Sequence, residues 1–182
     1  RSSAASDVYK RQLASRPEII EELYEEQVRV YSDGAGGFAP LDYDTQKSSV
    51  PVLDAVIRET LRMHPPIHSL MRRVKSDMVV PPTLAAPKTG KGQSTDTYVI
   101  PKGHYLVAAP GVSQIDPHVW CDADKFDPHR WLGDKTLMDQ TDDAQEDFGW
   151  GLVSTGANSA YLPFGAGRHR CIGEQFAYLQ LC

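Results

Sequence analysis

The sequence has few cysteines, no long apolar run and no excess of positive charge. Its three cysteines stand far apart, at Cys121, Cys171 and Cys182, and predict no disulfide framework. No run of about 18 apolar residues occurs, so the sequence as it stands shows neither a membrane span nor a signal peptide. Acidic residues outnumber basic ones by 24 to 19, and the net charge of −5 argues against a nucleic-acid binder. The remaining composition is that of a globular chain, long enough at 182 residues for one domain with a sizeable core.

The most informative segment is a glycine-rich, basic loop that ends in a cysteine, Phe164-Gly165-Ala166-Gly167-Arg168-His169-Arg170-Cys171-Ile172-Gly173. An apolar run from Ile172 to Leu181 follows and predicts a helix. A thiolate just before a helix lies near the positive end of the helix dipole, where free backbone N–H groups stabilise it. A cysteine in that position is suited to ligate a metal. The glycines let the backbone approach a large flat ligand, because they carry no Cβ.

Three other interpretations of this loop compete. A lone cysteine before a helix is most often a small buried hydrophobe. The run Gly165-Ala166-Gly167 begins like a dinucleotide-binding fingerprint, but Arg170 stands where the third glycine belongs, and no β-branched strand precedes the loop. A zinc site would need more ligands than His169 and Cys171, since the sequence contains no Cys-x-x-Cys pair.

Phe164, Gly167, Cys171 and Gly173 together make this loop resemble the haem-binding loop of the cytochrome P450 superfamily. The resemblance implies that Cys171 is the catalytic thiolate and the axial ligand of haem iron, and that the other three residues shape the cofactor loop. It also implies a mainly α fold with small β-sheets, the C-terminal part of the cytochrome P450 fold. The chain then corresponds to about the last third of an enzyme whose membrane anchor and oxygen-activating helix lie upstream.

Helices are expected in the first third of the chain. Residues 1–12 show no helical or strand period, so we place them outside the family domain, which we assign to residues 13–182. An amphipathic, largely solvated helix is expected from Pro17 to just before Asp33. A second helix is expected from Ser48 or Ser49, with Pro51 in its first turn, to the stop at His64-Pro65-Pro66. Its buried face would carry apolar residues at helical spacing, namely Val52, Leu53, Val56, Ile57 and Leu61.

The rest of the chain reads as extended or irregular. Residues 67–74 are expected to be extended, and residues 98–107 to form a β-hairpin that turns at Pro101-Lys102-Gly103. Residues 113–160 are expected to be mostly irregular, with short helical pieces.

Glu59 and Arg62 are three residues apart on the second expected helix, so their side chains share one face. Farther along the chain, Phe126-Asp127-Pro128-His129-Arg130-Trp131 resembles the aromatic-x-Pro-x-Arg segment of the family. The resemblance implies a buried network of Glu59, Arg62 and Arg130 that supports the haem pocket and takes no part in the chemistry. Removal of one member would leave a buried charge without its partner, at a cost of about 3–5 kcal/mol.

A run beginning at Pro66 narrows the resemblance to the sterol 14α-demethylases, which carry a Leu/Ile-His-Ser motif followed by arginine. Arg72 then matches an arginine that pairs with a haem propionate, for which its planar guanidinium is suited. His169 replaces the arginine that most of the superfamily has two residues before the cysteine, as in the fungal sterol demethylases, and is the second propionate ligand implied. The residues implied to line the substrate cavity are Ile67, His68, Ser69, Leu70 and Met71.

The function implied by the resemblance is that of a haem-thiolate monooxygenase. Its full-length form would remove the 14α-methyl group of a sterol precursor in ergosterol biosynthesis, and the chain by itself is expected to be inactive. The cofactor implied is haem b (iron protoporphyrin IX), with NADPH acting indirectly through NADPH-cytochrome P450 reductase. The other partners are the sterol, molecular oxygen and the cytoplasmic face of the endoplasmic reticulum membrane, with no nucleic acid. Two alternatives stay open: a cytochrome P450 acting on another lipid or a xenobiotic, and a non-catalytic haem-thiolate fragment.

Overall fold

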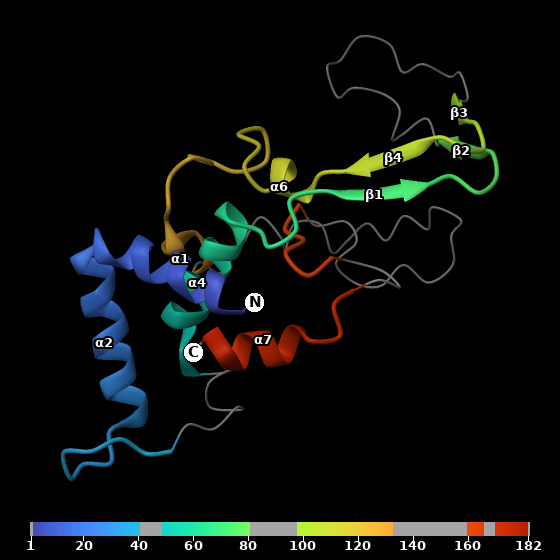
Figure 1. Cartoon of the computed structure of the whole chain (residues 1–182). Coiled ribbons are helices and arrows are strands. Elements are labelled where there is room, and N and C mark those ends of the chain that lie inside the picture. Colours follow the sequence, from blue (N-terminus) through green and yellow to red (C-terminus); the bar gives the residue numbers. More distant parts are fainter. Residues whose placement is uncertain (1, 41–48, 81–97, 133–159, 166–169, 182) are drawn as a thin grey trace.

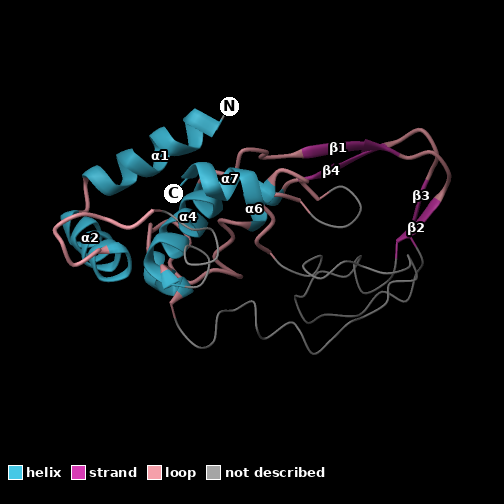
Figure 2. Ribbon diagram, turned by 90° about the horizontal axis from the view of Figure 1, so that it is seen from below, coloured by secondary structure: helices cyan, strands magenta, loops and turns pink. Residues whose placement is uncertain are grey.

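Helices gather at one end of the molecule, and a long antiparallel ribbon extends from the other (Figures 1 and 2). The computed structural model describes residues 2–40, 49–80, 98–132, 160–165 and 170–181. Within these residues no helix has the length and apolar character needed to cross a membrane. The mainly α architecture with small antiparallel sheets agrees with the expected fold class.

Helix α1 (Ser2–Ala14) occupies the segment for which no regular structure was expected, so that expectation was wrong. The segment contains good helix formers but only a weak apolar period, which is why its pattern did not indicate a helix. It packs against α4 and α7, and Tyr9 contacts a core cluster centred on Ile57 and Leu61. Tertiary packing therefore stabilises α1 more than its own pattern does. The domain boundary at residue 13 stays a prediction.

Helix α2 (Pro17–Tyr31) has the predicted bounds, with proline in its first turn. It is amphipathic, and its buried side includes Ile19, Glu26 and Tyr31. The buried glutamate caps the next helix. Its Oε1 accepts the N–H of Val52 at 2.8 Å, and its Oε2 accepts the N–H of Leu53 at 2.9 Å. These are two of the N–H groups that a helix leaves without intrahelical partners at its N-terminus.

Helix α4 (Pro51–Met63) lies at the centre of the helical end and contacts α1, α2 and the 3₁₀ helix η1 (Pro128–Trp131). It ends before His64, as the following prolines predicted. The predicted apolar face supplies the core of the molecule. Val56 packs with Ile19 and Phe126. Ile57 and Leu61 pack with Leu181 of the last helix, α7 (Glu174–Leu181). Helix α7 begins two residues later than the predicted apolar run.

Four strands form one long ribbon instead of the hairpin expected at residues 98–107, so the hairpin prediction was wrong. Strand β1 (Leu70–Arg73) pairs with β4 (Tyr105–Ala108), and β2 (Met78–Val80) pairs with β3 (Tyr98–Ile100). Strands β3 and β4 are successive in the chain but do not pair with each other.

The Pro101-Lys102-Gly103 turn bends one arm of the ribbon rather than closing it. Gly103 has a φ of +95°, which glycine adopts readily, and its N–H donates to the carbonyl of Val74 in the opposite arm at 2.9 Å. The N–H of Lys102 donates to Oδ1 of Asp77 at 2.8 Å. The turn was therefore predicted correctly from its residues. The segment that it contacts, however, lies some 25 residues upstream and is not the adjacent strand.

The pairing register is the same on both sides of this bend. From Leu70 to Met78 one arm advances by eight residues, and its partner in the other arm retreats by eight, from Ala108 to Ile100. The two short sheets are thus parts of one continuous pairing.

An irregular segment joins the ribbon to η1, as expected for this part of the chain. It contains the short helix α6 (Pro110–Ser113) and is pinned by Trp120, whose Nε1 donates to the carbonyl of Ser113 at 3.0 Å. This segment crosses the C-terminal half of α4, where the polar side chains discussed next are buried.

Candidate functional site

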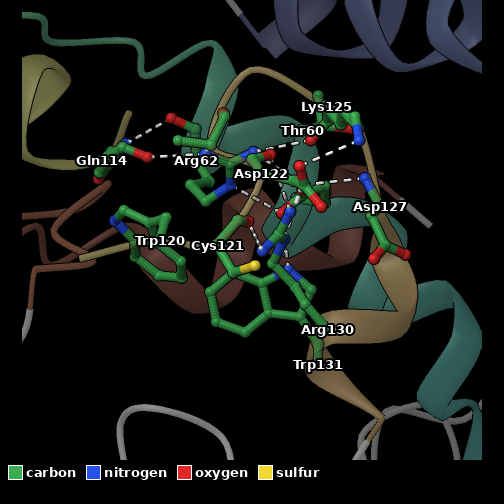
Figure 3. A network of polar contacts seen from close by, with 12 residues as sticks. Thr60, Arg62, Gln114, Trp120, Cys121, Asp122, Lys125, Asp127, Arg130 and Trp131 are labelled. Carbon is green, nitrogen blue, oxygen red and sulfur yellow. Dashed lines mark hydrogen bonds and ion pairs between the residues drawn. The ribbon is translucent and has the colours of Figure 1, made fainter. Parts of the chain in front are cut away.

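Glu59, Arg62 and Arg130 lie together in the structure, and the first two are completely buried. Arg62 binds the carboxylate in a bidentate manner, from Nε to Oε2 and from Nη2 to Oε1, each at 2.8 Å. Arg130 reaches the same carboxylate from η1, with its Nε donating to Oε1 at 3.0 Å. Figure 3 shows Arg62 of α4 and Arg130 of η1 with their guanidinium groups close together. Such paired, charge-assisted bonds offset the cost of burying the charges.

Two further donors complete the environment of the Glu59 carboxylate. The indole Nε1 of Trp131 donates to Oε2 at 3.0 Å, and the backbone N–H of Asp127 donates to Oε1 at 3.0 Å. The sequence reasoning missed both donors. The 3₁₀ turn of η1 brings the residue next to Arg130 to the same carboxylate, and no short-range pattern indicates that contact.

The guanidinium of Arg62 also organises the irregular segment after α6. Its Nη1 donates to the carbonyls of Gln114 and Ala123 at 2.8 and 2.9 Å, and its Nη2 donates to that of Lys125 at 3.1 Å. The ring of Trp120 covers the guanidinium at 5.5 Å. With the two bonds to Glu59, all five N–H groups of this arginine are used. A segment without regular structure is thus held in one conformation by a single buried side chain.

A backbone hydrogen bond joins the two ends of the cysteine loop. The N–H of Cys171 donates to the carbonyl of Phe164 at 2.9 Å, and the turn before it contains Gly165 at a φ of +73°. Cys171 is exposed and forms no disulfide. A Cβ added to Gly173 would lie 3.8 Å from its Sγ, so the glycine backbone stands close to the sulfur. Helix α7 begins three residues after the cysteine, as a helix-dipole position requires.

A row of aromatic rings connects this loop to the buried network. Phe164 packs on Tyr178 of α7 at 5.7 Å between ring centroids, and Trp131 packs on Tyr161 at 4.9 Å. Burial raises the pKa of Tyr178 to about 12, and burial also raises the pKa of Tyr161 well above its usual value. Both phenols are therefore neutral at any physiological pH, and the row acts as packing.

The described part of the loop suits a flat, largely apolar ligand with one metal bond. The exposed thiol of Cys171 is a soft ligand, and the exposed side chains of Ile172 and Phe176 offer apolar surface beside it. Gly167 and His169 lie outside the described residues. In the part of the chain that is described, no three His, Cys, Asp or Glu side chains group as a metal site, so the zinc interpretation gains no support there.

The segment predicted to contact substrate leaves the C-terminus of α4 and enters β1. Leu70 is half-buried, and the remaining members are exposed, namely Ile67, His68, Ser69 and Met71. Met71 and Arg72 face opposite sides of the ribbon, because successive strand residues alternate. Among the described residues, no hydrogen bond or ion pair joins this segment to the cysteine loop.

Arg72 and His68 differ in how they are held. Arg72 is exposed and forms no ion pair with any described residue, and its Nη1 donates to the carbonyl of Met71 at 3.2 Å. The ring of His68 instead lies against α6. A Cβ added to Gly111 would come within 2.6 Å of its Cδ2, and the N–H of Gly111 donates to the His68 carbonyl at 3.1 Å. The absence of a side chain at Gly111 therefore makes room for the imidazole.

Comparison with known proteins adds independent findings. A family model described as Cytochrome P450 matches residues 11–182. The lanosterol 14-alpha demethylase of Mycosarcoma maydis is 65% identical over 182 residues, which cover 99% of this chain and 32% of that protein. The eburicol 14-alpha-demethylase of Uncinula necator is 48% identical over 182 residues, with the same coverage. The lanosterol 14-alpha demethylase of Eremothecium gossypii is 47% identical over 180 residues. The chain thus spans about a third of the length of the curated relatives it matches.

Proposed function

The chain belongs to the cytochrome P450 family, and from that premise we propose that it is the haem-binding part of a fungal sterol 14α-demethylase. The full-length protein would remove the 14α-methyl group of a sterol precursor with molecular oxygen and electrons from an NADPH-dependent reductase. The observation that carries the proposal is the exposed Cys171 thiol at the start of α7, in a loop closed by Phe164. The names and identities of the relatives support the sterol as substrate.

In this proposal each part of the chain has a distinct role toward haem b. Cys171 binds the iron through Sγ, and Phe164, Gly167 and Gly173 let the loop lie close to the porphyrin. The bound haem supplies the iron at which oxygen is activated. Arg72 and His169 hold the propionates by charge-assisted hydrogen bonds. Arg72 is suited to this role because it has no described carboxylate partner within the chain.

The segment 67–71 would bind and orient the sterol. It offers apolar side chains from Ile67, Leu70 and Met71, together with the polar His68 and Ser69, to a ligand that is apolar except for one hydroxyl. Glu59, Arg62 and Arg130 would support the pocket without contacting substrate. We also propose that the full-length protein works at the cytoplasmic face of the endoplasmic reticulum membrane, with the reductase as its partner.

The test uses the full-length protein that contains this chain. Its reduced carbon-monoxide complex should show the red-shifted Soret band of thiolate-ligated haem, and Cys171→Ala should abolish that band. Cys121→Ala is the matched control, because it removes the other described free and exposed cysteine and should leave the band unchanged. Survival of the band in Cys171→Ala would contradict the assignment of the ligand.

Added sterols distinguish the proposal from its two alternatives. Lanosterol or its 24-methylene relative should shift the Soret band of the oxidised protein, since a sterol bound beside the haem would change the surroundings of the iron. A shift caused by another lipid or a xenobiotic, with none from either sterol, would favour a cytochrome P450 of different specificity. A thiolate-ligated protein that oxidises none of these compounds in the presence of reductase would favour a non-catalytic role.

A further inference from the structure

Gln114 is completely buried, and both donors and the acceptor of its side chain are hydrogen-bonded. Its Nε2 donates to the carbonyls of Leu61 and Arg62 at 3.0 and 2.9 Å. Its Oε1 accepts the backbone N–H of Leu162 at 2.9 Å. One amide group therefore joins two segments that are about 100 residues apart in the chain, the last turn of α4 and the irregular segment that leads into the cysteine loop.

The two segments it joins are the two halves of the candidate site. On one side, the carbonyls of Leu61 and Arg62 belong to the end of α4, where a helix leaves its last carbonyls without intrahelical partners. On the other side, the carbonyl of Leu162 accepts the N–H of Gly165 at 3.2 Å, in the turn that leads to Cys171. Within the described residues, the side chain of Gln114 therefore links the buried charge network to that turn by hydrogen bonds.

The backbone of Gln114 is itself fixed at the correct place. Its carbonyl accepts Nη1 of Arg62 at 2.8 Å, and its N–H donates to the carbonyl of Pro110 in α6 at 3.0 Å. The position requires both halves of an amide. A carboxylate would face two carbonyl oxygens, and a hydrocarbon would leave three buried polar groups without partners.

We propose that Gln114 is a positioning residue, which transmits the geometry of the Glu59–Arg62–Arg130 network to the loop of Cys171 and so fixes where the thiolate stands. The proposal rests on the proposed function in one respect, that Cys171 ligates haem. It goes beyond that function because it assigns the connection between the charge network and Cys171 to a neutral side chain that belongs neither to the network nor to the cysteine loop.

The decisive variant is Gln114→Met in the haem-loaded, full-length protein, because methionine keeps the length of the side chain and removes the three hydrogen bonds. We expect the ratio of thiolate-ligated to thiolate-free haem, read from the Soret bands of the reduced carbon-monoxide complex, to fall about fivefold or more. Fivefold corresponds to the net loss of about one hydrogen bond, at about 1 kcal/mol. Amide hydrogen exchange of a peptide containing Leu162 should accelerate by a similar factor.

Two control variants separate positioning from loss of stability. Gln27→Met removes another glutamine side chain whose amide nitrogen is buried but has no hydrogen-bond partner among the described residues, and it should change neither measurement. Val56→Ala in the core of α4 should lower the melting temperature by creating a cavity, yet should keep the thiolate-ligated fraction. An equal loss of that fraction in Val56→Ala would overturn the proposal.

Gln114→Asn provides a milder change and carries the test if the methionine variant does not fold. It retains the amide but is one methylene shorter, so it should shift both measurements in the same direction by less. A wild-type ratio in the folded Gln114 variants would overturn the positioning role, even with faster exchange at Leu162. A wild-type protein without the red-shifted band would refute the haem-thiolate function instead, and the exchange data would then decide whether Gln114 holds the Leu162 turn.

Discussion

At the scale of single residues, the helical end of this molecule depends on side chains that are polar and yet fully buried. Arg62, Gln114, Glu26 and Glu59 are among its largest side chains without solvent exposure. Such groups are costly to bury unless each polar atom has a partner, and here hydrogen bonds supply those partners. We therefore expect substitutions at these positions to cost more than changes of similar size in the apolar core.

A glycine provides the sharpest prediction at this scale. Because a Cβ at Gly111 would lie 2.6 Å from the ring of His68, Gly111→Ala should push the imidazole away from α6. If His68 hydrogen-bonds the sterol, the dissociation constant for sterol should rise by up to about tenfold, the value of one neutral hydrogen bond. Titration of the sterol-induced Soret shift in the full-length protein measures this constant.

The double variant tests the physical reason for that effect. His68→Ala alone should weaken sterol binding to a similar degree, and Gly111→Ala should then add little, because both changes remove the same contact. Val112→Ala, at the neighbouring exposed position of α6, is the control and should bind sterol as the wild type does. Fully additive effects of Gly111→Ala and His68→Ala would show that the glycine does not set the position of the ring.

At the scale of elements, α4 is held at both ends by side chains from other segments. Glu26 of α2 accepts two N–H groups at its N-terminus, and Gln114 donates to two carbonyls at its C-terminus. Neither end has a local side-chain cap, since Val50 precedes the helix and His64 follows it. The position of α4, and with it that of Glu59 and Arg62, is therefore set by tertiary contacts.

The N-terminal contact predicts a specific loss of stability. Glu26→Gln keeps the shape of the side chain but leaves one acceptor oxygen where two N–H groups need partners, and it removes a negative charge from a helix N-terminus. We expect the free energy of unfolding to fall by about 1–3 kcal/mol, measured by urea denaturation. Glu25→Gln changes the exposed neighbour and should stay within about 0.5 kcal/mol of wild type. Equal effects of the two substitutions would exclude the capping role.

The elements themselves could be predicted from the sequence only where local signals were strong. The apolar spacing and prolines gave the bounds of α2 and the end of α4, although α4 begins at Pro51 and not at Ser48 or Ser49. Helix α1 was missed because packing compensates for its weak pattern. The strand pairing of the ribbon was predicted wrongly, because the residues of the turn at Pro101–Gly103 resemble those of a hairpin loop. The roles of Glu26, Gln114 and Trp131 could not be predicted, because each contacts residues 26 or more positions away and no spacing rule connects them. Glu59, Arg62 and Arg130 were found through a family resemblance, not through their spacing.

At the scale of the whole molecule, the Glu59 carboxylate is the point where separate segments meet. Donors come from α4, from η1 and from the backbone just before η1. Because they share one carboxylate, they form a single unit, and loss of any one side chain leaves a hydrogen-bonding group of the buried network without its partner. The stability of the irregular segment and that of α4 therefore depend on each other.

Shared dependence predicts non-additive substitutions. Glu59→Gln, Arg62→Met and Arg130→Met should each lose about 3–5 kcal/mol and prevent most haem incorporation, and a second substitution should add little to the first. Haem content per protein chain, with unfolding by urea, measures both effects. Lys125→Met removes an exposed ion pair with Asp122 and should leave haem content unchanged. A triple variant much worse than each single one would show that the residues act independently.

The unbroken register of the ribbon sets a rule for how this protein can change in length. A residue inserted into one arm alone would turn every side chain beyond it to the opposite side, so insertions and deletions within the arms must occur in matched pairs. Length differences among related sequences should therefore fall between residues 80 and 98, beyond the paired positions. Removal of two residues from each arm would shorten the reach of the ribbon by about 7 Å and would leave every remaining side chain on its original side.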